Sequence, residues 1–241
     1  MPRMVSIQPG AAKNRINNKM NKPAAAPLPT ELHRTLAELE EFGKTKWAFT
    51  FTKEENQKKT VARFDPSKEQ ERQWALLRIN EREPTPEEFR SYQTMSSIKN
   101  GINFDVTEAE VPGLLSLLIK RGTVQVLKAS EDKLRYSFVP QVDIPFCRKL
   151  VEKLKGEFVF CKKQQMLETI EIRNQVPFSP VPSVKVNKLY WYARFGRLHE
   201  SGGLQLVSAT WSVKGRQFYV SALDLVGRIL YSDYSLVSGK H

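Results

Sequence analysis

The fold of this chain is decided by one segment, Val186-Asn187-Lys188-Leu189-Tyr190-Trp191-Tyr192-Ala193-Arg194-Phe195. Apolar side chains alternate in it with basic and tyrosine side chains, which is the period-two pattern of a strand with one buried and one wet face. The pattern continues through 204–214, through 215–222 with Phe218, Val220 and Ala222 on the buried side, and through 227–231. Glycines stand at the first two connections, so the C-terminal part predicts a four-stranded antiparallel meander that forms a curved sheet.

The rest of the chain adds strands and a few helices. A helix is expected over 31–42, between Thr30 as N-cap and Gly43 as stop. A second is expected from Pro86 to about Met95, because Thr85 and Glu88 have the spacing of a capping box. Residues 107–119 fit a helix or a strand, and a short helix from Pro145 would end at Gly156 as its C-cap. Further strands are predicted at 47–52, 61–64, 74–79, 123–128, 134–138, 157–161 and 167–173, with a polar turn at 53–59.

The count is about eleven strands and three or four helices, and the strands follow one another without an α/β alternation. A mainly β (α+β) antiparallel fold is therefore expected. Residues 1–28 are polar and end in a proline- and alanine-rich run, which predicts a disordered leader or linker. We expect one domain over 29–236 and a flexible tail over 237–241.

The chain of 241 residues is basic, with a formal net charge of +12, and 40% of its residues are hydrophobic. The first thirty residues hold five basic and no acidic side chains, and the remainder holds 33 basic and 26 acidic. No apolar run is long enough to span a bilayer as a helix. A basic excess favours an anionic partner, either nucleic acid or an anionic lipid surface, but it is also ordinary for a solvated protein surface.

The cysteines and the N-terminus bear on the compartment. Cys147 and Cys161 match no zinc or redox spacing; they would form one bridge under oxidising conditions or stay as two small buried thiols. The first 26 residues contain no apolar segment of the kind found in secretory signals. The sequence as given therefore leaves two compartments open: the cytoplasm, or a compartment reached through a signal that was removed or lies upstream.

Catalytic chemistry finds little support in the sequence. The three histidines, His33, His199 and His241, stand in no metal-binding spacing, and no nucleophile elbow or phosphate-binding glycine loop occurs. Asp224 and Asp233 would serve general acid–base catalysis only if their carboxylates lay close together. The alternative is that they bind turn amides or a cation such as Arg216. We therefore expect no enzyme, no catalytic residue, no metal and no cofactor.

Several short motifs together resemble a known family. They are Phe64-Asp65-Pro66-Ser67, Trp74-Ala75-Leu76-Leu77, Pro84-Thr85-Pro86-Glu87-Glu88, Leu154-Lys155-Gly156, Ile170-Glu171-Ile172-Arg173-Asn174, Pro177-Phe178-Ser179-Pro180, Lys214-Gly215-Arg216, Leu223-Asp224 and Tyr231-Ser232-Asp233-Tyr234. In combination over about 29–234 they resemble an uncharacterised family of Gram-negative envelope proteins with the fold of the lipoprotein carriers LolA and LolB. The resemblance implies a strongly curved antiparallel half-barrel whose concave face is covered by helices around an apolar cavity, in the periplasm or cell envelope.

Large apolar side chains are the candidate ligand contacts. A cavity between the sheet and the helices would be lined by Trp47, Phe49, Phe51, Trp74, Phe158, Phe160, Trp191 and Phe195. Basic residues at its rim would meet a phosphate headgroup, and the candidates are Lys185, Lys188, Arg194 and Arg197. The predicted protein is a monomeric, non-catalytic carrier of a lipid, a lipidated protein or another long apolar ligand.

Three alternatives remain open. The apolar face is a dry core filled by the helices, in which case the protein is an envelope scaffold that binds another protein along a strand edge. Tyr190, Tyr192, Lys188 and Arg194 share one strand face, which is the aromatic and basic arrangement of single-strand nucleic-acid binders; this reading is disfavoured because no RNA-recognition motif accompanies it. In the third alternative, the candidate rim cations belong to a solvated outer face and bind no headgroup.

Overall fold

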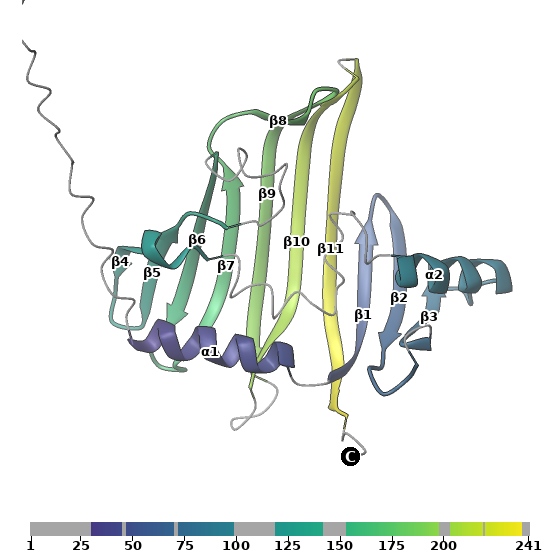
Figure 1. Ribbon diagram of the computed structural model, residues 1–241, viewed down its shortest axis with the longest axis horizontal. Helices are drawn as coiled ribbons and strands as arrows, with labels where there is room; N and C mark the ends of the chain where they lie inside the picture. The colour runs from purple at the N-terminus through teal and green to yellow at the C-terminus, as the bar shows by residue number, and fades with distance from the viewer. Residues whose placement is uncertain are drawn as a thin grey trace, which may run out of the picture.

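The described residues form one antiparallel sheet of eleven strands that curves and does not close (Figure 1). The computed structural model describes residues 30–44, 47–69, 72–98, 119–141, 153–197, 203–218 and 220–237. The expected leader 1–28 and most of the expected tail lie outside these ranges. The strands are β1 (Trp47–Glu55), β2 (Lys58–Phe64), β3 (Trp74–Ile79), β4 (Gln125–Ala129), β5 (Lys133–Phe138), β6 (Leu154–Cys161), β7 (Met166–Asn174), β8 (Phe178–Val181), β9 (Val184–Arg197), β10 (Leu204–Gln217) and β11 (Ser221–Leu236).

The strand order joins the two ends of the chain in the middle of the sheet. It runs β3-β2-β1-β11-β10-β9-β7-β6-β5-β4, with β8 pairing with β9 beside this path. The first strand lies next to the last, with Phe51 opposite Tyr231. The predicted mainly β, antiparallel class is confirmed, and β3 and β4 are left as the two edges.

Helices are fewer than predicted. The described residues contain two α-helices, α1 (Thr30–Lys44) and α2 (Pro86–Ile98), and one 3-10 turn, η2 (Arg121–Thr123), instead of three or four helices. Neither α-helix is long and apolar enough to cross a membrane. The segments 107–118 and 145–152, where further helices were predicted, lie outside the described residues. Gly156 is not a helix C-cap, because it lies inside β6.

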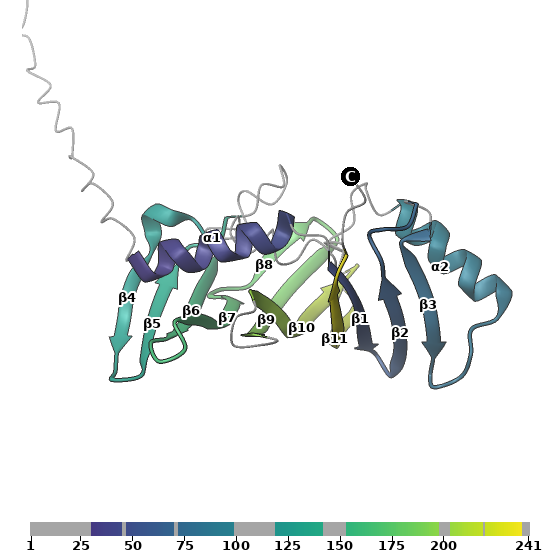
Figure 2. The same cartoon turned by 90° about the horizontal axis from the view of Figure 1, so that it is seen from below.

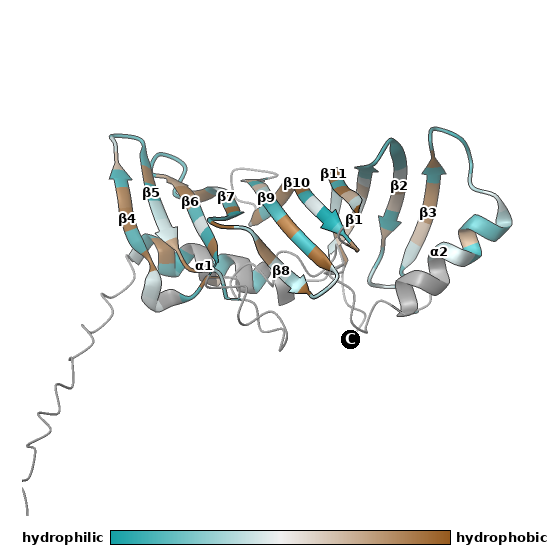
Figure 3. Ribbon diagram, turned by 90° about the horizontal axis from the view of Figure 1, so that it is seen from above, coloured by the Kyte–Doolittle hydropathy of each residue, from teal (hydrophilic) through white to brown (hydrophobic). Residues whose placement is uncertain are grey.

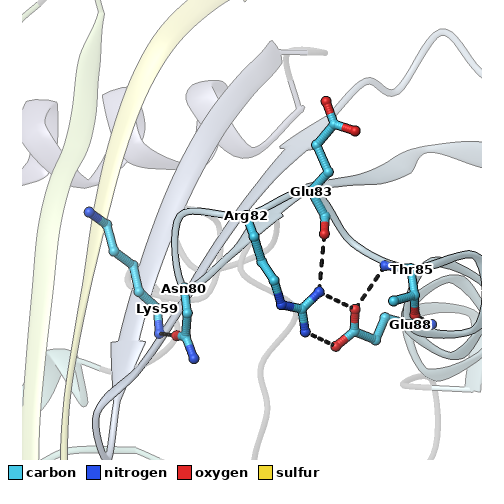
Figure 4. A network of polar contacts seen from close by, with 6 residues as sticks. All are labelled: Lys59, Asn80, Arg82, Glu83, Thr85 and Glu88. Carbon is cyan, nitrogen blue, oxygen red and sulfur yellow. Dashed lines mark hydrogen bonds and ion pairs between the residues drawn. The ribbon is translucent and has the colours of Figure 1, made fainter.

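The start of α2 forms as the sequence predicts. The Thr85 amide donates to Glu88 Oε2 at 2.8 Å, and the Glu88 amide donates to Thr85 Oγ1 at 3.2 Å, which completes the capping box. The Arg82 guanidinium holds the same carboxylate with two bonds of 2.8 and 2.6 Å (Figure 4). These bonds lower the pKa of Glu88 to about 2, and the hydrogen bond from Arg82 makes the largest contribution. The cap therefore joins the β3–α2 connection to the helix.

The C-terminal meander has three long strands and the short β8, and its turns differ from the prediction. The segment 215–222 is not a separate strand: β10 runs on to Gln217, and Phe218 stands in the turn that leads to β11. Phe218 and Val220 are exposed by 63% and 86%, so their predicted place on a buried face is wrong. Similarly, the polar turn predicted at 53–59 shrinks to Asn56 and Gln57, both with positive φ, as in a two-residue hairpin loop.

The two faces of the sheet differ in character. Side chains on the inner face form one continuous core cluster from Trp74 on β3 to Tyr136 on β5. Apolar and polar residues alternate along β9 (Figure 3), so its other side chains point to the outer face. Helix α1 packs near β10 and buries Leu32 in the core, while α2 packs on β3 (Figure 2). The inner face is therefore the one that a ligand would share with the helices.

Candidate functional site

The predicted apolar residues come together on one face of the sheet. All eight belong to the inner core cluster or pack against it. Six are buried, and Trp47 and Trp191 are half-buried. The strands bring them together from distant parts of the chain: β1, β3, β6 and β9 each contribute at least one.

A first aromatic cluster lies where β1, β2, β3 and β11 meet. The Phe49 ring lies 5.3 Å from Phe64, 6.2 Å from Trp74 and 5.6 Å from Tyr231, centroid to centroid. Most of these ring pairs are tilted or edge-to-face, the geometries that aromatic quadrupoles favour. Phe49 and Trp74, which were predicted to line a cavity, are thus packed against other rings.

A second aromatic cluster lies at β5 and β6. Tyr136 stacks on Phe158 with centroids 4.7 Å apart, and Phe138 lies 5.8 Å from Phe158. Burial raises the pKa of Tyr136, with a smaller contribution from the charge of Glu31 on α1. The Phe138 ring covers Gly156, where an added Cβ would come within 2.2 Å of it. This close approach explains the glycine in the middle of β6.

Between the clusters, the centre of the inner face combines small residues with two tryptophans. Ala193 pairs with Ala209 across β9 and β10, and Trp191 pairs with Trp211 two residues along. Both tryptophans are half-buried. The Trp211 ring lies over Gly227. A Cβ added at Gly227 would lie only 2.2 Å from that ring.

One cation accompanies this central region. Lys53 on β1 places Nζ 5.6 Å from the centroid of the Trp211 ring, a cation–π contact. The same ammonium lies 3.4 Å from Glu55, and the Lys53 side chain is 24% exposed. Sequence reasoning missed Lys53, Ala209 and Trp211; the alternation through 204–214 contained the two β10 residues, but the strand that brings Lys53 beside them is distant in sequence.

The four predicted rim cations do not gather around the apolar face. Arg197 reaches α1, where its guanidinium lies 3.1 Å from Glu38. Lys188 and Arg194 alternate with the inner residues of β9 and are exposed on the outer face, as is Lys185. Only Arg197 therefore stands near the helix that covers the inner face.

The outer face carries the aromatic and basic strip of β9 in a mixed-charge setting. The rings of Tyr190 and Tyr192 stack 6.5 Å apart and nearly parallel, at 6°. Glu171 pairs with Tyr192 across β7 and β9, and its charge, after burial, contributes to a raised pKa of Tyr190. Glu157 nearby lies 3.1 Å from Arg173. Arg135 and Lys155 also pair with Glu157, so the carboxylates on this part of the face are matched by cations.

Two grooves are lined mainly by outer-face residues, although the larger also contacts Trp211 and Gly227 of the central region. The larger, of about 660 Å³, is beside the β1–β2 turn and includes Tyr190, Val226 and the Glu54–Arg228 ion pair of 2.8 Å. The hydrogen bond from Arg228 lowers the pKa of Glu54. A smaller groove of about 260 Å³ is lined mainly by charged residues around Tyr192. Neither groove is lined by any of the eight predicted cavity residues.

Within the part of the chain that the structure describes, side chains suited to catalysis or metal binding stay apart. Asp224 lies 3.6 Å from Lys214, and Asp233 accepts a bond from Ser232 at 3.0 Å. Nine residues along one strand separate the two aspartates by about 30 Å, so they form no acid–base pair. Among the described residues, no three His, Cys, Asp or Glu side chains cluster to hold a metal ion. Cys161 has a free, half-buried thiol, and Cys147 lies outside the described residues.

Comparison with the models of known protein families gave no match for this chain, and comparison with curated proteins found no relative.

Proposed function

We propose that this protein is a non-catalytic carrier that holds a lipid or another long apolar ligand against the inner face of its sheet, in the bacterial envelope. The observation that carries the proposal is the centre of that face, where half-buried Trp191 and Trp211 lie between two packed aromatic clusters. The half-barrel of the LolA and LolB carriers, which the sequence motifs resemble, is the finer fold that we propose along with it.

The energetics favour an apolar ligand without polar recognition. Burial of each methylene contributes about 0.8 kcal/mol, so a chain of about fifteen methylenes would gain roughly 12 kcal/mol before the costs of ordering. Contact with two indole rings and the flanking apolar surface would supply such burial. This explains why no motif of a polar binding site is needed.

The position of Lys53 suggests how the ligand lies. The Lys53 side chain is 24% exposed, and its ammonium lies beside Trp211 at the central region of the inner face. An acyl chain that crosses Trp191 and Trp211 would bring an anionic headgroup to Lys53, in competition with Glu55. Ala193 and Ala209, the small pair beside the indoles, are themselves buried.

The two other functions receive less support. A polynucleotide would have to stack on Tyr190 and Tyr192. The cation opposite Tyr190 is Arg173, and it is already paired with Glu157 and Glu171. A scaffold would bind along an edge strand, and β4 is exposed along its whole length. That edge is only five residues long, which is short for a strand-addition site.

The experiment uses the tryptophans as local probes. The chain has four, and a fatty acid brominated along its acyl chain quenches indole fluorescence only on close contact. We expect the ligand to quench the wild type, and Trp191→Phe with Trp211→Phe to remove most of the quenched signal. Trp74→Phe is the matched control, because Trp74 packs within the first aromatic cluster at 8% exposure.

Native mass spectrometry of protein purified without harsh detergent adds an independent test, with bound lipid as the expected result. An apo mass, together with no quenching by the brominated fatty acid, would refute the lipid carrier. Quenching that survives in the Trp191 and Trp211 double variant would place the ligand elsewhere. A polynucleotide affinity that falls steeply with salt would instead support the nucleic-acid function.

A further inference from the structure

The turn between β10 and β11 exposes apolar side chains at the free end of the longest strands. Strands β9, β10 and β11 extend past the β1–β2 turn, and their upper ends lie opposite the end that α1 covers (Figure 1). Phe218 and Val220 in this turn are exposed by 63% and 86%. The neighbouring β8–β9 turn joins them, because the Phe218 amide donates to the Ser183 carbonyl at 2.7 Å and Val181 is 45% exposed. We call Val181, Phe218 and Val220 the apolar tip.

The backbone holds the aromatic residue at the tip in a costly conformation. Phe218 has φ of 49°, in the left-handed region that bulky residues rarely enter. Asparagine or glycine would fit this turn position with less strain. A phenylalanine that is both strained and mostly exposed adds nothing to a folded core, so its packing in the isolated protein does not explain it.

Cations stand in like-charged pairs directly behind the tip. Across β9 and β10, Lys185 is opposite Arg216, and Lys188 is opposite Lys214. All four side chains are exposed and lie on the outer face. Like charges directly opposite each other in a sheet are destabilising. We call these four residues the basic collar.

Little negative charge balances this collar. Asp224, 3.6 Å from Lys214, is the carboxylate paired with it, and among the described residues Lys185, Lys188 and Arg216 make no ion pair. The segments 176–188 and 214–223 contain no acidic residue at all. An anionic surface that lay against this end would relieve the repulsion that the fold has built in.

From this combination we propose that the β10–β11 turn docks on an anionic lipid bilayer, with the apolar tip in the interfacial layer and the basic collar on the lipid phosphates. Apolar side chains backed by a ring of cations are what such a surface binds: the first bury in the acyl boundary, and the second gain from the surface potential. The strands project the tip beyond β1 and β2, so it can reach a flat surface without a steric clash from those strands. This inference goes beyond ligand binding and does not depend on it.

Vesicle sedimentation tests the docking surface with the full chain. The probes are phosphatidylcholine vesicles with and without phosphatidylglycerol, and we expect binding that requires the anionic lipid. Phe218→Asn with Val220→Asn should weaken it by about tenfold, since two apolar contacts with the bilayer are lost. Lys185→Gln with Arg216→Gln should weaken it by about 25-fold, at about fivefold for each charge near an anionic surface.

Matched controls come from the far edge of the sheet. Val126 and Leu127 on β4 are exposed by 58% and 46%, so Val126→Asn with Leu127→Asn changes the same kind of residue without touching the tip. Lys120→Gln with Lys128→Gln removes two exposed cations elsewhere. Both controls should bind as the wild type does, and thermal unfolding checks that every variant is folded.

Three outcomes would overturn the proposal. The first is a wild type that does not bind the anionic vesicles. The second is that the tip variant and the collar variant both bind the anionic vesicles as tightly as their control variants do. The third is a loss in the collar variant alone, matched by an equal loss of single-stranded polynucleotide binding; that pattern would assign the cations to nucleic acid.

Discussion

The two ends of β9, β10 and β11 differ in burial although the same apolar and polar alternation runs through both. At the end near α1, Phe195, Leu204 and Leu206 are buried together with Leu32 of the helix. At the other end, Phe218 and Val220 face the solvent. Local sequence pattern is thus a sign of strand structure, whereas burial depends on which element lies across the strand.

The covered end is held mainly by apolar contact. Helix α1 also makes the Glu38–Arg197 ion pair, at 3.1 Å, and a 3.4 Å hydrogen bond from Arg34 to the Gln165 carbonyl. Partly exposed pairs of this kind contribute about 0–1 kcal/mol. Burial of the Leu32 side chain contributes about 2 kcal/mol, so it outweighs the ion pair. The comparison between the ends can therefore be tested by apolar substitutions.

The largest effect is expected at the covered end. Leu206→Ala should lower the free energy of unfolding by about 3 kcal/mol, because a fully buried leucine leaves a cavity. Val220→Ala at the free end should change it by less than about 0.5 kcal/mol. Urea denaturation measures both. Equal losses in the two variants would show that the ends do not differ in the way we describe.

The middle of these strands should show an intermediate effect. Gly227→Ala places a Cβ 2.2 Å from the Trp211 ring, so the ring must move at a cost of about 2 kcal/mol. Gly203→Ala is the control, since an added Cβ there meets no atom within 4 Å. Denaturation curves and tryptophan emission would be measured together. An unchanged stability for Gly227→Ala would mean that the indole does not pack on the strand.

At the free end, one polar substitution should not destabilise the fold. Phe218→Asn should leave the unfolding free energy unchanged or raise it by up to about 1 kcal/mol, because asparagine accepts the left-handed backbone more readily. The same exchange at buried Phe195 serves as the contrast and should be strongly destabilising. A clear loss of stability in Phe218→Asn would show that this side chain packs against the protein.

The smallest effect concerns α2, which packs on β3 and takes no part in either end. The pKa of Glu88 is lowered from the ordinary 4.5 to about 2, so its stabilising bonds are complete above pH 4.5 and are lost as pH falls toward 2. We expect the amide signals of Thr85 and Glu88 in NMR spectra to shift over that window. In Glu88→Gln this dependence should vanish, whereas Glu87→Gln should keep it. A midpoint near 4.5 would contradict the Arg82 contact.

Sequence patterns predicted the elements best where a few neighbouring residues specify the structure. The strand at 74–79 was predicted with its exact bounds, and the helix after Thr85 began where its capping box requires. Errors arose where a residue type serves two purposes. Gly156 was predicted to end a helix, but in the structure it makes room for the Phe138 ring. Phe218 was predicted to lie in a strand, but it lies in a turn.

The candidate site was predicted in part. Large apolar residues on alternating positions predicted the inner face, because aromatic side chains in strands are favoured on a buried face. The contribution of Lys53 and Trp211 was missed, since cross-strand neighbours are invisible until the strand order is known. Lys188 and Arg194 were placed at the rim of the apolar face, although their alternation with the apolar residues of 186–195 already puts them on the outer face.

The alternation of residue types is enough to specify a mainly β chain with one apolar and one polar face, because backbone geometry fixes the period of side chains along a strand. Which strands pair with one another depends on the folded arrangement of the whole chain. The pairing of β1 with β11 joins residues at opposite ends of the chain, and any antiparallel partner would have matched the same alternation. It is this pairing that brings Lys53 to Trp211 in the centre of the sheet. Helix α1 covers one end of the long strands, whereas the other end holds the small cluster of Phe178 and Val186 and leaves its turn residues exposed.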